Sequence, residues 1–171
     1  VQFELTKVKG QWRITSAPNG VIVERSTFSM VWTTRQLYFV SPDQRLVSEV
    51  RWMLNQQPSL LPTQIVRGLM AGPSELMAGA VTTAFPEATR LTGQGIPIVD
   101  GTAVIDCSPE LLDVDEATIA TLTRQISTSL QGLPGVMRFQ IAVQGEVLGG
   151  GEVAISEEQS TGEFQGTAAI K

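Results

Sequence analysis

Five carboxylates lie close together in the sequence and have the clearest spacing for chemistry: Asp100, Asp106, Asp113, Asp115 and Glu116. Carboxylate oxygens are preferred ligands of Ca²⁺ and Mg²⁺, so one interpretation is a divalent-cation site. Their spacing does not match an EF-hand loop. Local structure also accounts for these acids, because Asp100 precedes Gly101 in a hairpin turn and the last three lie where a helix begins. We prefer the structural interpretation and predict no metal site and no cofactor.

A catalytic centre is not predicted, because the usual residue sets are missing. The chain has no histidine, which removes the commonest general base and the commonest transition-metal ligand. No serine stands in a Gly-x-Ser-x-Gly motif. The single cysteine, Cys107, ends an alternating apolar pattern that is typical of a small buried side chain. We therefore predict no catalytic residues and a binding or interaction module rather than an enzyme.

Aromatic side chains are the remaining candidates for a ligand surface, because they could stack on a glycan or a peptide. Tyr38 and Trp52 fall within apolar strand patterns, so we expect both of them in the core. Trp32 stands at a junction between segments. It is the one residue that we predict for an interaction surface.

Charge and hydropathy exclude two classes of partner. The net charge is −5, and the positive side chains are scattered. No basic stripe is available for nucleic acid or anionic lipid. No apolar run approaches the roughly 20 residues that a membrane-spanning helix needs.

The segment 113–143 is predicted to form the helix and strand on which the other elements pack. Apolar residues recur there at steps of three and four, which predicts one buried helix face: Ile119, Leu122, Ile126, Leu130 and Leu133. Asp113 and Glu116 resemble a capping box, and Gly132 with Pro134 should end the helix. Residues 138–144 then alternate with the period of a half-buried strand.

The other elements predict an α+β fold, with a mixed, mostly antiparallel sheet, two main helices on one of its faces and an N-terminal β-hairpin at 1–16. Strands are expected at 37–40 and 46–52, with Leu46, Val50 and Trp52 sharing the buried face of the second. Pro62 should open a helix that Gly72 and Pro73 end. Residues 149–151 are three glycines and are expected to be a flexible joint.

A set of segments in this order resembles the GerMN domain of sporulation and spore-germination proteins, and more closely that domain in the actinobacterial LpqB lipoproteins. The segments are 37–40 (LYFV), 62–73 (PTQIVRGLMAGP), 99–108 (VDGTAVIDCS), the helix of 113–133, then 134–136 (PGV) and 140–145 (QIAVQG). Residues 11–14 and 17–20 also resemble the end of the LpqB N-terminal domain.

The resemblance implies three parts: the end of that N-terminal domain at 1–30, a GerMN-like domain at 31–148, and at 149–171 a linker or first strand toward a propeller. It implies a parent protein held on the outer face of the cytoplasmic membrane by an upstream lipid anchor, without contact of this chain with the membrane. Because the chain begins inside an alternating pattern with no initiator methionine, we expect it to be a piece of that longer protein.

The function that the resemblance implies is modulation of a two-component sensor kinase, and so of cell-envelope and division control, through the extracytoplasmic domain of the kinase. Two alternatives stay open. One is a module that binds peptidoglycan or polysaccharide of the cell wall, and the other is a scaffold that forms rings or oligomers.

Overall fold

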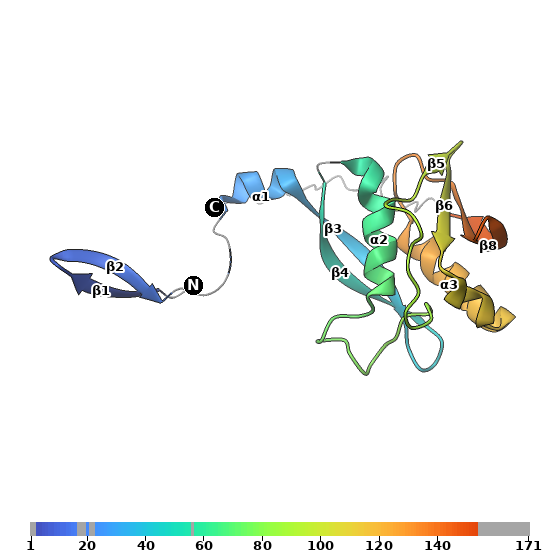
Figure 1. The fold of residues 1–171 in the computed structure, drawn as a ribbon, viewed down its shortest axis with the longest axis horizontal. Helices are drawn as coiled ribbons and strands as arrows, with labels where there is room; N and C mark the ends of the chain where they lie inside the picture. Colours follow the sequence, from blue (N-terminus) through green and yellow to red (C-terminus); the bar gives the residue numbers. More distant parts are fainter. Residues whose placement is uncertain (1–2, 17–19, 21–22, 56, 154–171) are drawn as a thin grey trace, which may run out of the picture.

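The computed structural model describes residues 3–16, 20, 23–55 and 57–153 of the chain. Its helices are α1 (Arg25–Val31), α2 (Leu61–Met70) and α3 (Glu116–Ser129). Its strands are β1 (Glu4–Val8), β2 (Gln11–Ser16), β3 (Trp32–Val40), β4 (Leu46–Leu54), β5 (Ile98–Val99), β6 (Thr102–Cys107), β7 (Arg138–Val143) and β8 (Glu146–Glu152). The predicted α+β class, with mostly antiparallel strands and an N-terminal hairpin, is confirmed (Figure 1).

The strands are divided among three sheets. β1 pairs with β2, β3 pairs with β4, and the third sheet has the order β5-β6-β7-β8. Among the strand pairs of the described residues, β6–β7 is parallel and the others are antiparallel. All residues of β1 and β2 are exposed, and their hairpin lies apart from the rest of the structure (Figure 1).

Helix α2 covers one face of the β3–β4 sheet. Pro62 lies in its first turn as predicted, and its buried face includes Ile65, Val66 and Leu69. The helix approaches β3 closely at Gly68, where an added Cβ atom would lie 2.6 Å from Cδ2 of Leu37. A side chain at position 68 would therefore require the Leu37 side chain or the helix to shift.

Helix α3 lies between the two larger sheets and contacts β3 and β8. Leu122, Ile126 and Leu130 are fully buried, as the predicted helix face required. The start of the helix differs from the prediction. The N-cap is Asp115, whose side chain accepts a hydrogen bond from the Thr118 amide at 2.8 Å. Asp113 instead ends a separate 3₁₀ turn that Pro109 opens, since proline suits the first position of a turn of helix.

The predicted buried face of β4 was wrong. Trp52 is 57% exposed and Val50 is 61% exposed, whereas Met53 is buried. The inner face also carries Glu49 and Arg51, which form an ion pair of 3.0 Å. This pair also bonds the backbone of residues 72 and 74, so both charged side chains can face inward. The alternation of apolar and polar residues along β4 therefore predicted the wrong face as buried.

The three glycines at 149–151 lie within β8 and not in a flexible joint. Gly150 allows a close approach to β7, because a Cβ atom there would lie 2.5 Å from the Phe139 carbonyl oxygen. The sheet therefore continues past the predicted domain boundary at residue 148. The remainder of the predicted linker, 154–171, lies outside the described residues.

Candidate interaction surfaces

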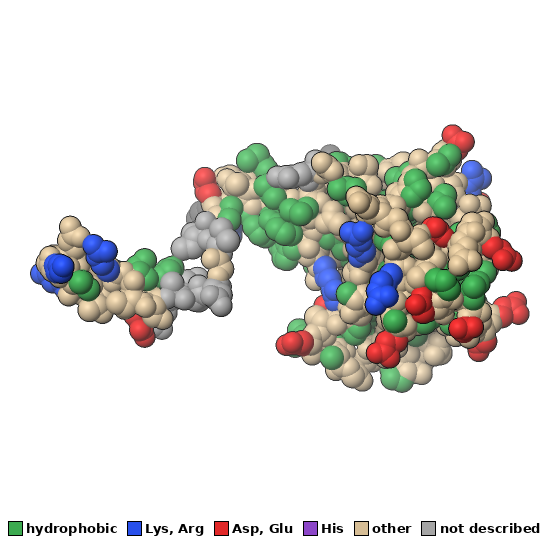
Figure 2. Space-filling model, in the orientation of Figure 1, with side chains coloured by type: hydrophobic (Ala, Val, Ile, Leu, Met, Phe, Trp, Pro, Cys, Tyr) green, Lys and Arg blue, Asp and Glu red, His purple; other side chains and the backbone are tan. Residues whose placement is uncertain are grey.

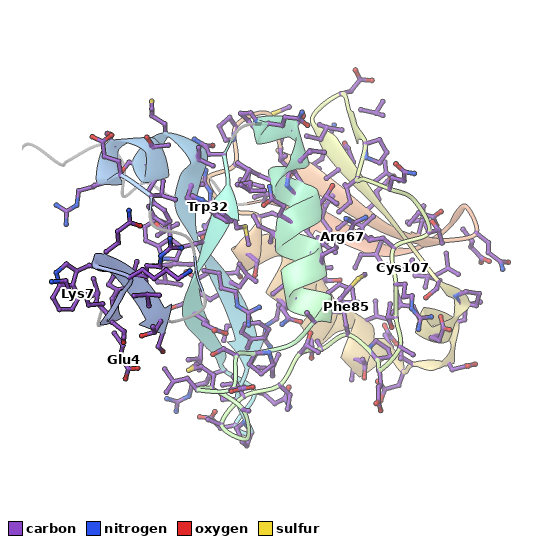
Figure 3. All side chains as sticks on the ribbon, turned by 60° about the vertical axis from the view of Figure 1, so that its left-hand side comes forward. Glu4, Lys7, Trp32, Arg67, Phe85 and Cys107 are labelled. Atoms are coloured by element: carbon purple, nitrogen blue, oxygen red, sulfur yellow. The ribbon has the colours of Figure 1, made fainter. Side chains whose placement is uncertain are left out.

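The outer face of the β3–β4 sheet carries an aromatic cluster at its junction with α1. The Phe28 ring stacks on Trp32 with 6.1 Å between the ring centroids, and it meets Trp52 edge-on at 4.9 Å. Offset-stacked and edge-to-face pairs of this kind stabilise aromatic clusters. Trp32 lies where α1 meets β3 (Figure 3). The cluster thus joins α1 to both strands of the hairpin.

Strand register extends this cluster into a continuous apolar surface. Along this face, Trp32 pairs with Leu54, Thr34 pairs with Trp52, and Gln36 pairs with Val50. We define the aromatic face as Phe28, Trp32, Val50, Trp52 and Leu54. Hydrophobic side chains gather at this end of the structure, next to α1 (Figure 2). An exposed apolar surface of this kind marks a site of interaction in many proteins.

Sequence reasoning found Trp32 but missed its neighbours. Trp32 itself is half-buried beneath Phe28, and Trp52 presents more surface. The sequence did contain a signal for Trp52. Glu49 and Arg51 alternate with Val50 and Trp52 along β4, so the two charged residues share one face and the two apolar residues share the other. One of these two faces had to be the exposed one. The role of Trp32 in an interaction stays a prediction.

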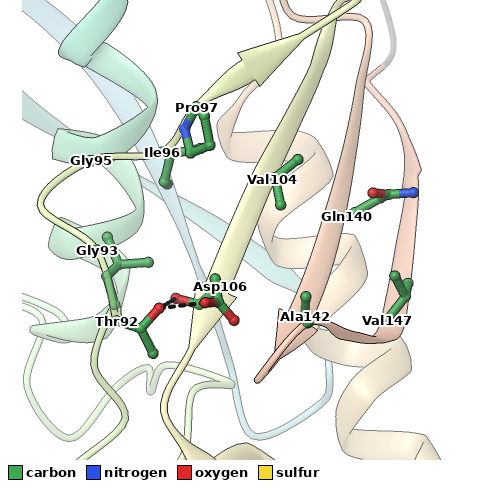
Figure 4. Close-up of a pocket in the computed structure, with 12 residues that line it drawn as sticks. Thr92, Gly93, Gly95, Ile96, Pro97, Val104, Asp106, Gln140, Ala142 and Val147 are labelled. Atoms are coloured by element: carbon green, nitrogen blue, oxygen red, sulfur yellow. Dashed lines mark hydrogen bonds between the residues drawn. The ribbon is translucent and has the colours of Figure 1, made fainter.

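A groove lies on the face of the four-stranded sheet that α3 does not cover (Figure 4). It has a volume of ≈ 460 Å³ and is bounded by the loop 91–97 on one side. Its floor is formed by side chains of β6, β7 and β8, namely Val104, Asp106, Gln140, Ala142 and Val147. The lining is mostly apolar with one carboxylate, which suits binding more than chemistry.

Asp106 is the single acidic group of this groove. Its Oδ2 atom accepts a hydrogen bond of 2.6 Å from the Thr92 hydroxyl, whereas Oδ1 is buried without a partner among the described residues. Among the described residues that line the groove there is no second acid, and the one hydroxyl, that of Thr92, donates its hydrogen bond to Asp106. The described residues of the groove therefore offer no pair of groups for acid–base catalysis.

The five predicted carboxylates are not gathered into one site. Asp100 lies in the β5–β6 turn with a φ of 49°, and Asp106 lies in β6. The other three lie at the 3₁₀ turn and at the start of α3. Within the residues that the structure describes, no group of three or more histidine, cysteine or acidic side chains is placed to hold a metal ion.

Cys107 is fully buried at the end of β6. Burial, with a smaller contribution from the neighbouring Asp106 carboxylate, raises the pKa of its thiol to about 12. The group is protonated at neutral pH, and a protonated thiol is a poor nucleophile. Cys107 therefore acts as a small core residue.

None of the helices in the described part of the chain has the length and hydropathy to cross a membrane.

Two family models match the chain. The model described as sporulation and spore germination matches residues 36–149, and the model of the lipoprotein LpqB N-terminal domain matches residues 1–29. The boundary between these matches falls within α1 and the start of β3, where Phe28 packs against Trp32. Neither description is that of an enzyme family.

Curated relatives are lipoproteins LpqB of actinobacteria. The chain is 26% identical over 147 residues to that of Cutibacterium acnes, covering 85% of this chain and 24% of the relative. It is 26% identical over 151 residues to that of Thermobifida fusca, with the same two coverages. For Corynebacterium jeikeium the identity is 35% over 113 residues, covering 63% of this chain and 19% of the relative. The chain thus spans about a quarter of the length of these relatives, or less.

Solved structures show the same fold. The tandem GerMN domains of the sporulation protein GerM from Bacillus subtilis match with a TM-score of 0.53 at 17% identity, over 78% of this chain and 44% of that one. The first GerMN domain of GerM matches with a TM-score of 0.53 at 18% identity, over 74% and 98% of the two chains. The chain therefore belongs to the sporulation and spore germination family, and it carries this domain directly after a segment that matches the LpqB N-terminal domain.

Proposed function

We propose that this chain is a non-catalytic, extracytoplasmic part of a lipid-anchored lipoprotein on the outer face of the cytoplasmic membrane. It modulates a two-component sensor kinase, and through it cell-envelope and division control, by contact with the extracytoplasmic domain of the kinase. The relatives named lipoprotein LpqB support the lipoprotein assignment. The kinase as partner rests on the resemblance to the LpqB family.

The observation that carries an interaction role is the aromatic face. It combines large apolar side chains with high exposure, and within the described residues α1 covers only the part of this face where Phe28 contacts Trp32 and Trp52. Tryptophan is among the residues that contribute most to the binding energy of protein interfaces. Trp52 is the expected anchor, and Trp32 supports it through their shared neighbour Phe28.

Calorimetric titration of the full extracytoplasmic lipoprotein with the kinase extracytoplasmic domain tests the proposal. Trp52→Ala should weaken binding by about 2 kcal/mol, the loss typical of an interface hot spot. Trp12→Ala is the matched control, because Trp12 is 68% exposed on the separate β1–β2 hairpin. If the unsubstituted lipoprotein does not bind the kinase domain, the proposal is wrong.

A cell-wall module is the second candidate, and the exposed indole of Trp52 favours it because aromatic rings stack on sugar rings. Sedimentation of the chain with purified cell wall is the test. Binding that is lost in both Trp32→Ala and Trp52→Ala would support this function. Binding that persists in both variants would exclude the aromatic face as a glycan site.

A further inference from the structure

We infer that two copies of this chain pair edge to edge through strand β4, antiparallel, across a twofold axis at Val50. The inference goes beyond the proposed function and does not depend on it. Pairing at the edge leaves the outer face of the sheet open, so the aromatic face stays accessible in both copies.

The free edge of β4 follows from the directions of its backbone groups. Among the described residues, β4 pairs with one strand, β3. The N–H and C=O groups of Leu54 point away from β3, because they bond the Gln64 side chain at 3.0 and 2.9 Å. Directions alternate along a strand, so the backbone groups of Ser48, Val50 and Trp52 also point away from β3. Within the described residues, no hydrogen bond satisfies the groups of these three residues at this edge.

The other edge of the same sheet, that of β3, is protected in its C-terminal part. The N–H of Tyr38 donates to Ser129 Oγ at 3.1 Å, and its C=O accepts from the Gln125 amide at 2.7 Å. The next outward-pointing residue of β3, Val40, pairs with the backbone of Thr82. Helix α3 and one loop residue thus take the place of a neighbouring strand along the C-terminal part of β3, at Tyr38 and Val40.

Strand β4 has one feature that discourages edge pairing, the inward-pointing charges of Glu49 and Arg51, but these two side chains neutralise each other in an ion pair of 3.0 Å. The strand is nine residues long, its pairing with β3 has no register shift, and it contains neither lysine nor proline. Its exposed side chains include Val50 and Trp52. A long regular edge with exposed apolar side chains is a template for another strand.

Charge complementarity makes a second copy the occupant of this edge. With Val50 at the twofold axis, Glu49 lies opposite the partner's Arg51 and Arg51 lies opposite the partner's Glu49. The backbone groups that face the partner recur at every second residue, so the neighbouring registers have the twofold axis at Glu49 or at Arg51. The first would place Glu49 opposite the partner's Glu49, and the second would place Arg51 opposite the partner's Arg51. Like charges directly opposite each other are destabilising, so the charges select the register at Val50. The contact is isologous, as a twofold dimer requires.

Pairing in this register would join two β3–β4 hairpins into one four-stranded sheet. The aromatic faces of both copies would lie on the same side of it, with Ser48 opposite the partner's Trp52. The dimer would therefore present two Trp52 side chains on one surface to any partner of the aromatic face.

Sedimentation velocity of the 171-residue chain over a range of concentrations tests the inference. The unsubstituted chain should form a dimer, and Val50→Lys should raise the dimer dissociation constant at least about tenfold by placing two lysines opposite each other. Val147→Lys is the matched control, because Val147 is 55% exposed on β8 of the other sheet. This variant should dimerise like the unsubstituted chain.

Hydrogen exchange provides a second readout that needs no substitution. The amides of Ser48, Val50 and Trp52 should become protected as the concentration rises, while those of β1 and β2 should not. A chain that is monomeric at every concentration overturns the inference and leaves the edge to an extended segment of another protein. Equal loss of the dimer in Val50→Lys and Val147→Lys also overturns it, because the contact would then lie elsewhere.

Discussion

The hairpins β1–β2 and β3–β4 are both antiparallel and both alternate apolar with polar residues, yet their surroundings differ. Every residue of β1 and β2 is exposed. In β3–β4, one face packs on α2 and part of one edge is held by α3, while most of the outer face and the β4 edge stay open among the described residues. Leu37 and Phe39 are fully buried, whereas Leu5 and Ile14 remain more than half exposed. The comparison shows that alternation predicts a strand but not the layer that covers it.

The largest expected effect comes from disrupting the packing of α3, the helix that supports β3. Leu122→Asp places an unpaired charge at a fully buried position of α3, so unfolding should become easier by at least about 4 kcal/mol. Thermal melting by circular dichroism measures this change. Ala120→Asp, on the exposed side of the same helix, is the control and should melt within a few degrees of the unsubstituted chain. A native-like melt of Leu122→Asp would contradict the packing described for α3.

A smaller effect is expected from Gln125, which holds the edge of β3. Its side chain donates to the Tyr38 carbonyl and accepts from the Ala84 amide at 2.9 Å. Gln125→Leu keeps much of the volume but leaves buried backbone groups without partners, which should cost about 1–3 kcal/mol. Urea denaturation gives the free energy of unfolding. Gln140→Leu, at an exposed position of β7, should change it little, and equal losses in both variants would show that the edge contact is unimportant.

The inner face of β4 makes a pH-dependent contribution through Glu49. Burial by itself raises the pKa of this carboxyl. Hydrogen bonds from Arg51 and Ser74 together lower the pKa by more than burial raises it, so the pKa lies below its ordinary value. A lowered folded-state pKa stabilises the protein above the unfolded-state pKa, and this stability is lost as the pH falls through the folded-state pKa. Glu49→Gln should lose about 1 kcal/mol at neutral pH.

Urea denaturation of Glu49→Gln and the unsubstituted chain at a series of pH values tests this prediction. The two curves should converge in acid, below the ordinary pKa of a glutamate. A difference between the two proteins that stays constant with pH would mean that the charge of Glu49 does not stabilise the fold.

The smallest effect is expected from removing the first hairpin. A chain that starts at Gly20 keeps Phe28 and the whole aromatic face, and it loses two strands whose residues are all exposed. Its melting temperature should change by less than about 2 °C, since the loss of buried contacts shifts the midpoint in proportion. Differential scanning calorimetry measures the shift. A clear drop in the melting temperature would show that β1–β2 packs on the rest of the chain in solution. The two hairpins would then differ less in burial than described above.

Local patterns in the sequence determined much of this protein. Steps of three and four from Ile119 to Leu133 indicated the buried face of α3, and Pro62 indicated the start of α2, because both signals depend on neighbouring residues alone. The ordered set of segments also indicated the family that the comparisons show. The candidate surface was predicted only at Trp32.

Tertiary structure decided which side of each strand is covered and which edges stay open. Trp52 lies outside because Glu49 and Arg51 satisfy each other and the backbone of residues 72 and 74 on the inside, a balance that no local pattern contains. The glycines of β8 allow a close approach to Phe139 instead of forming a joint, which depends on a strand that precedes them in the chain. Hydropathy is a property of single residues, whereas burial and edge pairing depend on contacts between distant segments.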